Sequence, residues 1–245
     1  SLTSLDLNNF KTSFLKNISG MFENCISLEK LSINKINTEK VLDMSYLFDN
    51  CSSLKELDIS NFETSNVKKM NFMFQDCHNL SNINLSKFST SSAETVIGMF
   101  RRCYSLTSLD VSKFNTSKIK NMSFMFSNLK NLKIIDVSKF DTSQVTDMTA
   151  MFEECHTLSS IDVSKFNTSN TISMQYLFKG CYTLKSIDVS NFDTSKVYTI
   201  SHMFNGCKTI TSLDLSNFNT SKVNNLNAIF GGCENLKKLD IGSFN

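Results

Sequence analysis

The stretch MFEECHTLSSIDVSKFNTSNTISMQY at residues 151–176 is followed at once by a second version of itself, LFKGCYTLKSIDVSNFDTSKVYTISH at 177–202. The two versions align without a gap, and the cysteines repeat their spacing of 26 residues with a single gap of 52, whose midpoint is Leu129. Because 245 residues hold about 9.4 such units, the sequence predicts one repeat array and not several globular domains. The cysteines are Cys25, Cys51, Cys77, Cys103, Cys155, Cys181, Cys207 and Cys233.

Residue type depends on position within the unit, which we count from the cysteine as position 0. Positions 3, 6 and 8 are Leu, Ile or Val in almost every unit. Positions 11 and 23 hold 18 of the 21 phenylalanines, and positions 19 and 22 hold all 11 methionines. Such columns of one residue type are typical of a stacked core, in which each unit packs on its neighbours.

Each unit has two halves with different periodicity. Positions 6 to 8, as in 161–163, alternate apolar, polar and apolar residues, which predicts a short strand. Positions 16 to 26 carry apolar residues at offsets 0, 3, 6, 7 and 10, which favour one face of a helix, and the preceding Thr142 and Ser143 have hydroxyls suited to its first turn. One strand and one helix per unit predict an α/β, right-handed solenoid of the horseshoe kind. The apolar residues of one such segment are Val145, Met148, Met151, Phe152 and Cys155.

The strand half, as in LKSIDVSNF at 184–192, fits the leucine-rich repeat frame LxxLxLxx, with Phe where Asn or Cys usually stands. The whole unit, MFxxCxxLxxLDLSxFxTSxVxxM, resembles the BspA-like leucine-rich repeats of bacterial surface proteins over the entire chain. The resemblance implies a secreted or cell-surface protein, and several members look like adhesins. It implies no catalytic residue and names no ligand.

Composition excludes several classes of function. The net charge is +2, from 25 basic and 23 acidic residues, and the only arginines are the adjacent Arg101 and Arg102. The sequence has no basic stripe with interleaved aromatics, which is the pattern that would predict nucleic-acid binding. No apolar run approaches the roughly 18 residues of a membrane span. We find no catalytic constellation and expect no cofactor. Since the repeats run from end to end without polar caps, we expect 1–245 to be one solenoid domain cut from a longer chain.

The cysteine column has three interpretations. Disulfides between stacked units would need Cβ atoms that converge, whereas stacked side chains point in parallel. A zinc site needs four ligands around a point, and a column offers a line. Burial as small apolar side chains is the interpretation that allows leucine to substitute, and Leu129 does so. We therefore predict buried, unbridged cysteines and no metal site.

Position 7 is the first candidate for binding, because it lies between two core positions and must face away from the core. The C-terminal units place six consecutive carboxylates there, which we expect on the concave face of a horseshoe. Like charges on adjacent strands are unfavourable. Compensation by lysines at position 10, hydrogen bonds to the backbone or to the serines at position 9, bound calcium and a basic partner all remain open. The six residues are Asp110, Asp136, Asp162, Asp188, Asp214 and Asp240.

Aromatic side chains outside the core columns are the second candidate. His78, Tyr104, His156 and Tyr182 share position 1, just after the cysteine. The two histidines lie three units apart, about 14 Å at the spacing of strands in a sheet, so they cannot share a metal ion. Exposed aromatic residues favour protein binding, although packing between units is the simpler explanation.

Two functions follow from these features. The first is a protein-binding or adhesion module at the cell surface or outside the cell, directed at host or extracellular-matrix proteins, with glycans as a further class of partner. The second is a structural spacer or stalk without a ligand, which is favoured by the monotony of exposed positions such as those in Asp-Val-Ser-Lys-Phe at 110–114 and 136–140.

Overall fold

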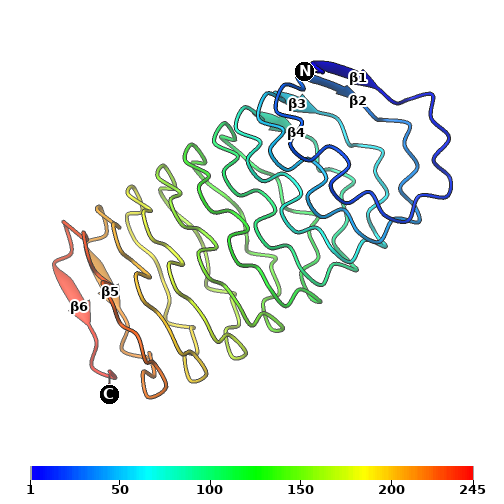
Figure 1. The fold of residues 1–245 in the computed structure, drawn as a ribbon. Coiled ribbons are helices and arrows are strands. Elements are labelled where there is room, and N and C mark those ends of the chain that lie inside the picture. Colours follow the sequence, from blue (N-terminus) through cyan, green and yellow to red (C-terminus); the bar gives the residue numbers. More distant parts are fainter. Residues whose placement is uncertain (1, 245) are drawn as a thin grey trace.

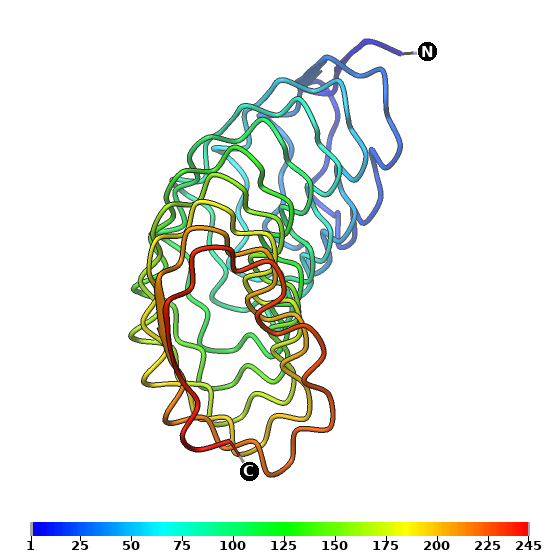
Figure 2. The same cartoon turned by 90° about the vertical axis from the view of Figure 1, so that its left-hand side faces the viewer.

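The computed structural model describes residues 2–244, which form an elongated stack of coils (Figure 1). Each 26-residue unit makes one coil, and the coils change orientation along the stack. Viewed from the C-terminal end, the chain encloses a narrow core with two long sides (Figure 2). One hydrophobic cluster runs from Leu7 to Ile229, so every coil contributes to the same core. The predicted repeat solenoid is confirmed.

One long side of the stack, the strand side, carries short strands at unit positions 5 to 7. They pair in parallel as β1 with β2, β3 with β4, and β5 with β6, and each pair joins residues 26 positions apart, as in Leu5 with Leu31. Parallel pairing of successive units is therefore confirmed at both ends of the stack. The strands are β1 (Ser4–Asp6), β2 (Lys30–Ser32), β3 (Glu56–Leu57), β4 (Asn82–Ile83), β5 (Ser212–Asp214) and β6 (Lys238–Asp240).

The prediction of a strand in every unit is wrong for the central coils, because the described chain has no strand between β4 and β5. The hydrogen bond between backbone groups at position 4 shows the reason. It measures 2.8 Å from Glu29 to Thr3 and 2.9 Å from Lys237 to Thr211, but 3.5 Å from Lys133 to Thr107. Adjacent coils are thus joined more loosely on this side in the middle of the stack.

The opposite side, which we call the turn side, comprises positions 16 to 25 and contains no helix in residues 2–244. The predicted helix is wrong. Near Cys51, the N–H groups of Met44, Tyr46, Phe48 and Asn50 each donate to a carbonyl of the next coil at 2.8–2.9 Å. Backbone groups that a helix would satisfy internally are therefore satisfied between coils.

A run of tight turns replaces the helix. The N–H of Leu47 donates to the carbonyl of Met44, and that of Cys51 donates to Phe48, three residues back in each case. Positive φ angles occur at positions 21 and 25, as in Tyr46 (59°) and Asn50 (57°). The turns direct the same apolar residues inward that a helix would, so the apolar spacing alone did not distinguish the two structures.

A continuous parallel ladder begins the turn side. Isolated bridges at position 18 connect every successive pair of coils from Asn17 to Asn225, without interruption. The hydroxyl column at position 13 reinforces the stack: Thr142 is buried, donates from Oγ1 to the carbonyl of Asn167 at 2.9 Å, and accepts from the N–H of Asn167 at 2.7 Å. The predicted role of Thr142 in a helix start is thus wrong, since its hydroxyl joins two coils.

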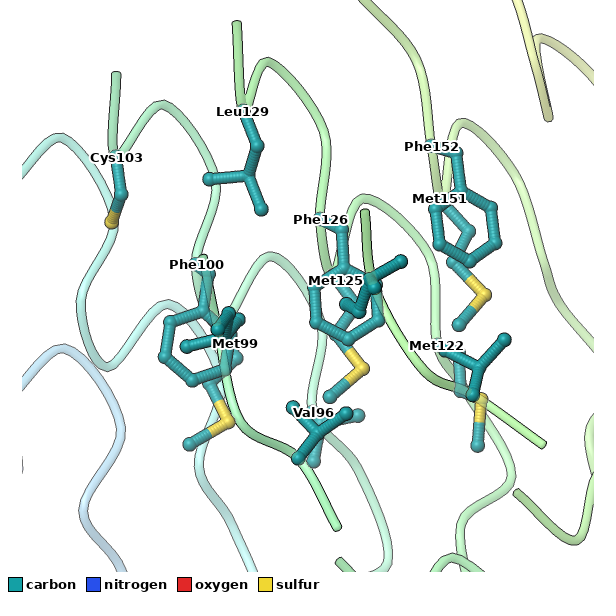
Figure 3. Packing of buried hydrophobic residues seen from close by; sticks show 14 of the residues in the cluster. Val96, Met99, Phe100, Cys103, Met122, Met125, Phe126, Leu129, Met151 and Phe152 are labelled. Atoms are coloured by element: carbon teal, nitrogen blue, oxygen red, sulfur yellow. The ribbon is translucent and has the colours of Figure 1, made fainter. Parts of the chain in front are cut away.

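The core is built from columns, as the sequence predicts. The ring of Phe126 stacks between Phe100 and Phe152 with centroid distances of 6.1 and 5.6 Å (Figure 3). Methionines fill the space beside these rings, and Leu129 occupies the place that Cys103 takes one coil earlier (Figure 3). All of these residues are buried. Close-packed columns of this kind explain why residue type repeats so strictly.

The cysteines are free and, apart from half-buried Cys25 and Cys233, buried, which confirms the prediction of unbridged core residues. Their thiols also make a contact that the sequence does not reveal. The Sγ of Cys155 donates to the carbonyl of Phe126 at 3.2 Å, and the same bond recurs in the other units from Cys51 onward that carry a cysteine. Burial raises the pKa of the Cys155 thiol to about 12, so this thiol stays protonated and is a poor nucleophile.

Candidate functional site

The six carboxylates at position 7 lie in one line on the strand side, and all are exposed. Each accepts a hydrogen bond from the backbone N–H two residues later. Asp110 accepts from Ser112 at 2.9 Å, Asp162 accepts from Ser164 at 2.9 Å, and Asp240 accepts from Gly242 at 2.9 Å. This local bond holds the chain where the strand side ends. Of the alternatives for offsetting repulsion between these carboxylates, hydrogen bonds to the backbone are the contacts that the column makes.

Charge around the Asp column changes along the stack. Hydrogen bonds from Ser112, and then the charges of Lys113 and Lys139, hold the pKa of the Asp110 carboxyl below its usual value. Further along, hydrogen bonds from Ser190 lower the pKa of Asp188, while the neighbouring carboxylates at 162 and 214 act in the opposite direction. The lysines at position 10 therefore compensate the central carboxylates but not those that follow.

The first pair of position-1 aromatics forms a compact cluster. The rings of His78 and Tyr104 stack with centroids 4.7 Å apart, and the Nζ of Lys130 lies 4.7 Å from the centroid of the Tyr104 ring. Asp76 completes the cluster: its Oδ1 lies 3.1 Å from Nε2 of His78 and 3.5 Å from a guanidinium nitrogen of Arg102. Stacking, a cation over a ring, one ion pair and one hydrogen bond between a carboxylate and an imidazole thus order five neighbouring side chains.

The second pair repeats this arrangement 78 residues later. His156 and Tyr182 stack with centroids 4.4 Å apart, and the Nζ of Lys208 lies 5.5 Å from the centroid of the Tyr182 ring. The Oε2 of Glu154 lies 2.7 Å from Nε2 of His156 and accepts a long hydrogen bond of 3.5 Å from the Tyr182 hydroxyl. Lys208 also pairs with Glu234 at 3.0 Å.

Position 1 therefore follows a longer period than the 26-residue unit. From 78 to 208 it runs His, Tyr, Lys, His, Tyr, Lys, with an acid two residues before each histidine. The structure brings each predicted His–Tyr pair together and adds Lys130 and Lys208, which the sequence analysis missed. The two lysines could be seen in the sequence at position 1 of the coil after each tyrosine, but an isolated lysine is usually solvated. We name these two groups the first and the second His–Tyr–Lys clusters.

The Asp column and the His–Tyr–Lys clusters remain separate. In the described chain, no hydrogen bond or ion pair joins Asp110, Asp136, Asp162, Asp188, Asp214 or Asp240 to His78, Tyr104, His156 or Tyr182. The candidate residues thus belong to two surfaces. The Asp column makes local hydrogen bonds to the backbone, whereas the His–Tyr–Lys clusters combine aromatic rings with charges of both signs.

A hollow of about 680 Å³ lies on the strand side near the N-terminal end, across β2, β3 and β4. It is found where the Asp column is interrupted by Ser32 and Asn84. Charges of both signs line it, including Lys30 and Glu56, so it has no single electrostatic preference. Sequence reasoning missed this hollow, because its lining residues come from three different coils.

The described residues show neither a metal centre nor a membrane span. Among residues 2–244, no three side chains of His, Cys, Asp or Glu are grouped so that they could hold a metal ion. This geometry does not favour calcium on the Asp column, because calcium takes six to eight oxygens around one point. Over the same residues, no helix has the length and apolar character needed to cross a membrane.

Solved structures similar to this chain are bacterial leucine-rich repeat proteins. One from Bacteroides ovatus is 16% identical, with 100% of this chain and 74% of that chain covered and a TM-score of 0.32. A leucine-rich cell surface protein from Faecalibacterium prausnitzii is 15% identical, covering 99% and 87%, with a TM-score of 0.38. An internalin from Listeria monocytogenes is 15% identical, covering 91% and 70%, with a TM-score of 0.32. Since these TM-scores lie below 0.5, the repeat solenoid is assigned from the geometry of the chain itself.

Sequence relationships give the family. No curated protein matches the chain significantly. The family model described as "Mycoplasma protein of unknown function, DUF285" matches residues 1–109, 97–188 and 173–245, which together span the whole chain. That description does not use the name BspA. The chain belongs to the DUF285 family of Mycoplasma proteins.

Proposed function

We propose that the chain is a binding module of a secreted or cell-surface leucine-rich repeat protein of the BspA-like kind, directed at host or extracellular-matrix proteins and glycans. The observation that carries this proposal is the pair of His–Tyr–Lys clusters. They present half-buried aromatic rings with flanking charges, and tyrosine is among the residues that dominate binding energy in protein interfaces. They are ordered before a ligand arrives, which reduces the entropy lost on binding.

The clusters are a better candidate than the strand side. Every carboxylate of the Asp column already accepts a backbone hydrogen bond, and the same residues recur in one coil after another. A specific epitope needs side chains that differ between units, as those at position 1 do. The Asp column therefore enters the proposal as a secondary surface that contributes charge.

A panel of extracellular-matrix proteins and glycans tests the proposal, with the purified chain immobilised and binding measured at low and high salt. We expect at least one saturable interaction, weakened tenfold or more by Tyr104→Ala combined with Tyr182→Ala. Asp136→Asn combined with Asp162→Asn measures the secondary contribution of the Asp column and should weaken binding less. This variant should keep the fold, because Asn occupies position 7 naturally as Asn84 and accepts the same hydrogen bond from Ser86 at 3.1 Å.

A spacer without a ligand is the second candidate, and the strand side favours it. Its exposed residues are almost identical from coil to coil, and their hydrogen bonds are local. Absence of binding across the panel, with the chain shown to be folded by circular dichroism and thermal unfolding, would support the spacer and overturn the binding module.

A further inference from the structure

A hollow of about 420 Å³ opens beside the second His–Tyr–Lys cluster. Volumes in this range suit small-molecule sites, which usually lie between 300 and 1,000 Å³. The hollow spans four consecutive coils and joins side chains of the second cluster to a stretch of backbone without side chains of its own at Gly206, Gly231 and Gly232. It is lined by Glu154, Gly180, Tyr182, Asn205, Gly206, Lys208, Gly231, Gly232 and Glu234.

The floor is backbone, because three successive coils have glycine at position 25. Gly180, Gly206 and Gly232 have φ angles of 73°, 75° and 72°, in the left-handed region. A Cβ added to Gly206 would lie 3.5 Å from the Cα of Gly180 and 3.4 Å from a ring carbon of Tyr182. A side chain at Gly206 or Gly232 would thus occupy the space, whereas its absence leaves CH groups and the edge of the Tyr182 ring accessible. Gly180 is buried, because the Glu154 carboxylate covers it.

The first cluster is an internal control for this explanation. The residues 78 positions before the three glycines are Arg102, Asn128 and Glu154, each with a side chain and each with a positive φ. The backbone at position 25 thus has the same left-handed conformation in both blocks, and the floor of the hollow differs in carrying no side chain at these three residues.

The walls present hydrogen-bonding groups without a dominant charge. Glu154 is already paired with Lys179 at 3.7 Å, and Glu234 with Lys208 at 3.0 Å. Further groups at the rim are the amide of Asn205 and the hydroxyl of Tyr182. Carboxylates, an amide, a phenol and an ammonium group together both donate and accept. An ion of either sign would be repelled by some of these charged groups. A neutral ligand with several hydroxyl groups would find a hydrogen-bonding partner for each hydroxyl.

We propose that this hollow binds one residue of a neutral glycan. The sugar's CH groups would rest on the glycine floor and the edge of Tyr182, and its hydroxyls would bond to Glu154, Asn205 and Lys208. The inference rests on the proposed binding function and deepens it, since it assigns the glycan class of partner to one site. The first His–Tyr–Lys cluster lacks the floor and is left to protein contacts.

A glycan array with neutral, sialylated and sulfated oligosaccharides tests the assignment, followed by titration calorimetry with the strongest neutral probe. We expect saturable binding to neutral probes, reduced tenfold or more by Gly206→Asn. Asparagine stands at position 25 as Asn50 and Asn128 with φ of 57° and 63°, so this variant should fold. Asn128→Gly is the matched control at the first cluster and should leave the affinity unchanged.

Gly232→Asn fills the other end of the floor and provides a second variant should Gly206→Asn unfold at a lower temperature than wild type. Binding that both variants leave unchanged, binding confined to sulfated probes, or no glycan binding at all would overturn the assignment. The protein panel separates this failure from that of the proposed function. Protein binding that persists without glycan binding overturns only the sugar site, and the absence of both overturns the module.

Discussion

The two long sides of the stack contain the same number of coils but join them differently. On the turn side, backbone N–H groups of one coil reach carbonyls of the next at 2.8–2.9 Å near Cys51, and the bridges at position 18 continue without a gap from Asn17 to Asn225. On the strand side, the contact at position 4 stretches to 3.5 Å between Lys133 and Thr107. The difference shows that the turn side and its core columns hold the repeat together.

The comparison reverses the usual expectation for a leucine-rich repeat frame, in which the strand is the regular element. Here the strand segments are the part that loosens in the central coils. The turns remain regular because each coil has a positive φ at positions 21 and 25, and N–H groups of one coil meet carbonyls of the next along this side. Changes on the turn side should therefore cost more than equivalent changes on the strand side.

The largest expected effect is that of Phe126→Ala. The ring is fully buried and stacks on Phe100 and Phe152, so its removal should lower the free energy of unfolding by about 3–5 kcal/mol. Urea unfolding followed by circular dichroism measures the change. Phe14→Ala is the control, because Phe14 is 86% exposed and its loss should be nearly neutral. Equal effects of the two variants would contradict a core built on the phenylalanine column.

The hydroxyl that joins two coils should give the second effect. Thr142→Val keeps the shape of the side chain but leaves the N–H and the carbonyl of Asn167 without their partner. We expect a loss of about 1–3 kcal/mol in the free energy of unfolding, since unsatisfied buried groups carry that penalty. Thr183→Val serves as the exposed control. A variant as stable as wild type would show that Thr142 does not join the coils energetically.

Leu129→Cys sharpens the comparison within the turn side. It places at this position the cysteine that the remaining units carry. The new thiol should donate a hydrogen bond to the carbonyl of Phe100, at the cost of some apolar volume (Figure 3). Because the two effects oppose each other, we expect the free energy of unfolding to change by less than about 1.5 kcal/mol.

The cysteine column also predicts an order of thiol reactivity: half-buried Cys233 should react with a thiol reagent before fully buried Cys155. The reverse order would contradict the burial of the column.

The smallest effect belongs to the strand side. Hydrogen bonds from Ser112 lower the pKa of Asp110 in the folded chain, so the carboxylate stabilises the fold above its unfolded pKa, and this contribution is lost as the pH falls through the folded value. Asp110→Asn should keep the turn and remove this part of the pH dependence below about pH 4. Thermal unfolding between pH 3 and 7 measures it. A large loss of stability at pH 7 would contradict the minor role of this side.

The core could be predicted because burial constrains residue type: Phe126, Leu129 and the methionines repeat only where side chains stack. The helix could not be distinguished from the turns by apolar spacing, since both direct the same positions inward. A local signal was nevertheless present, because position 25 is Gly, Asn or Asp in most units, and these residues tolerate a positive φ. These units have Asn24, Asn50, Asp76, Asn128, Gly180, Gly206 and Gly232 at this position.

The candidate sites could be predicted only in part. The pairing of His78 with Tyr104 and of His156 with Tyr182 follows from a shared position in adjacent coils. The roles of Lys130 and Lys208 depend on how a flexible side chain lies over a ring, which spacing does not determine. The hollow depends on three glycines acting together, and each glycine taken singly indicates only a turn.

The longer order at position 1 has a consequence for how such a chain can change in length. Every junction between coils uses the same positions, so duplication or loss of 26 residues preserves the fold. The same event inside residues 78–130 or 156–208 would separate a ring or a lysine from the cluster that it now joins. Gain or loss of 78 residues within 78–208 keeps each remaining cluster whole, so this surface is copied intact by the three-coil block and not by the single repeat.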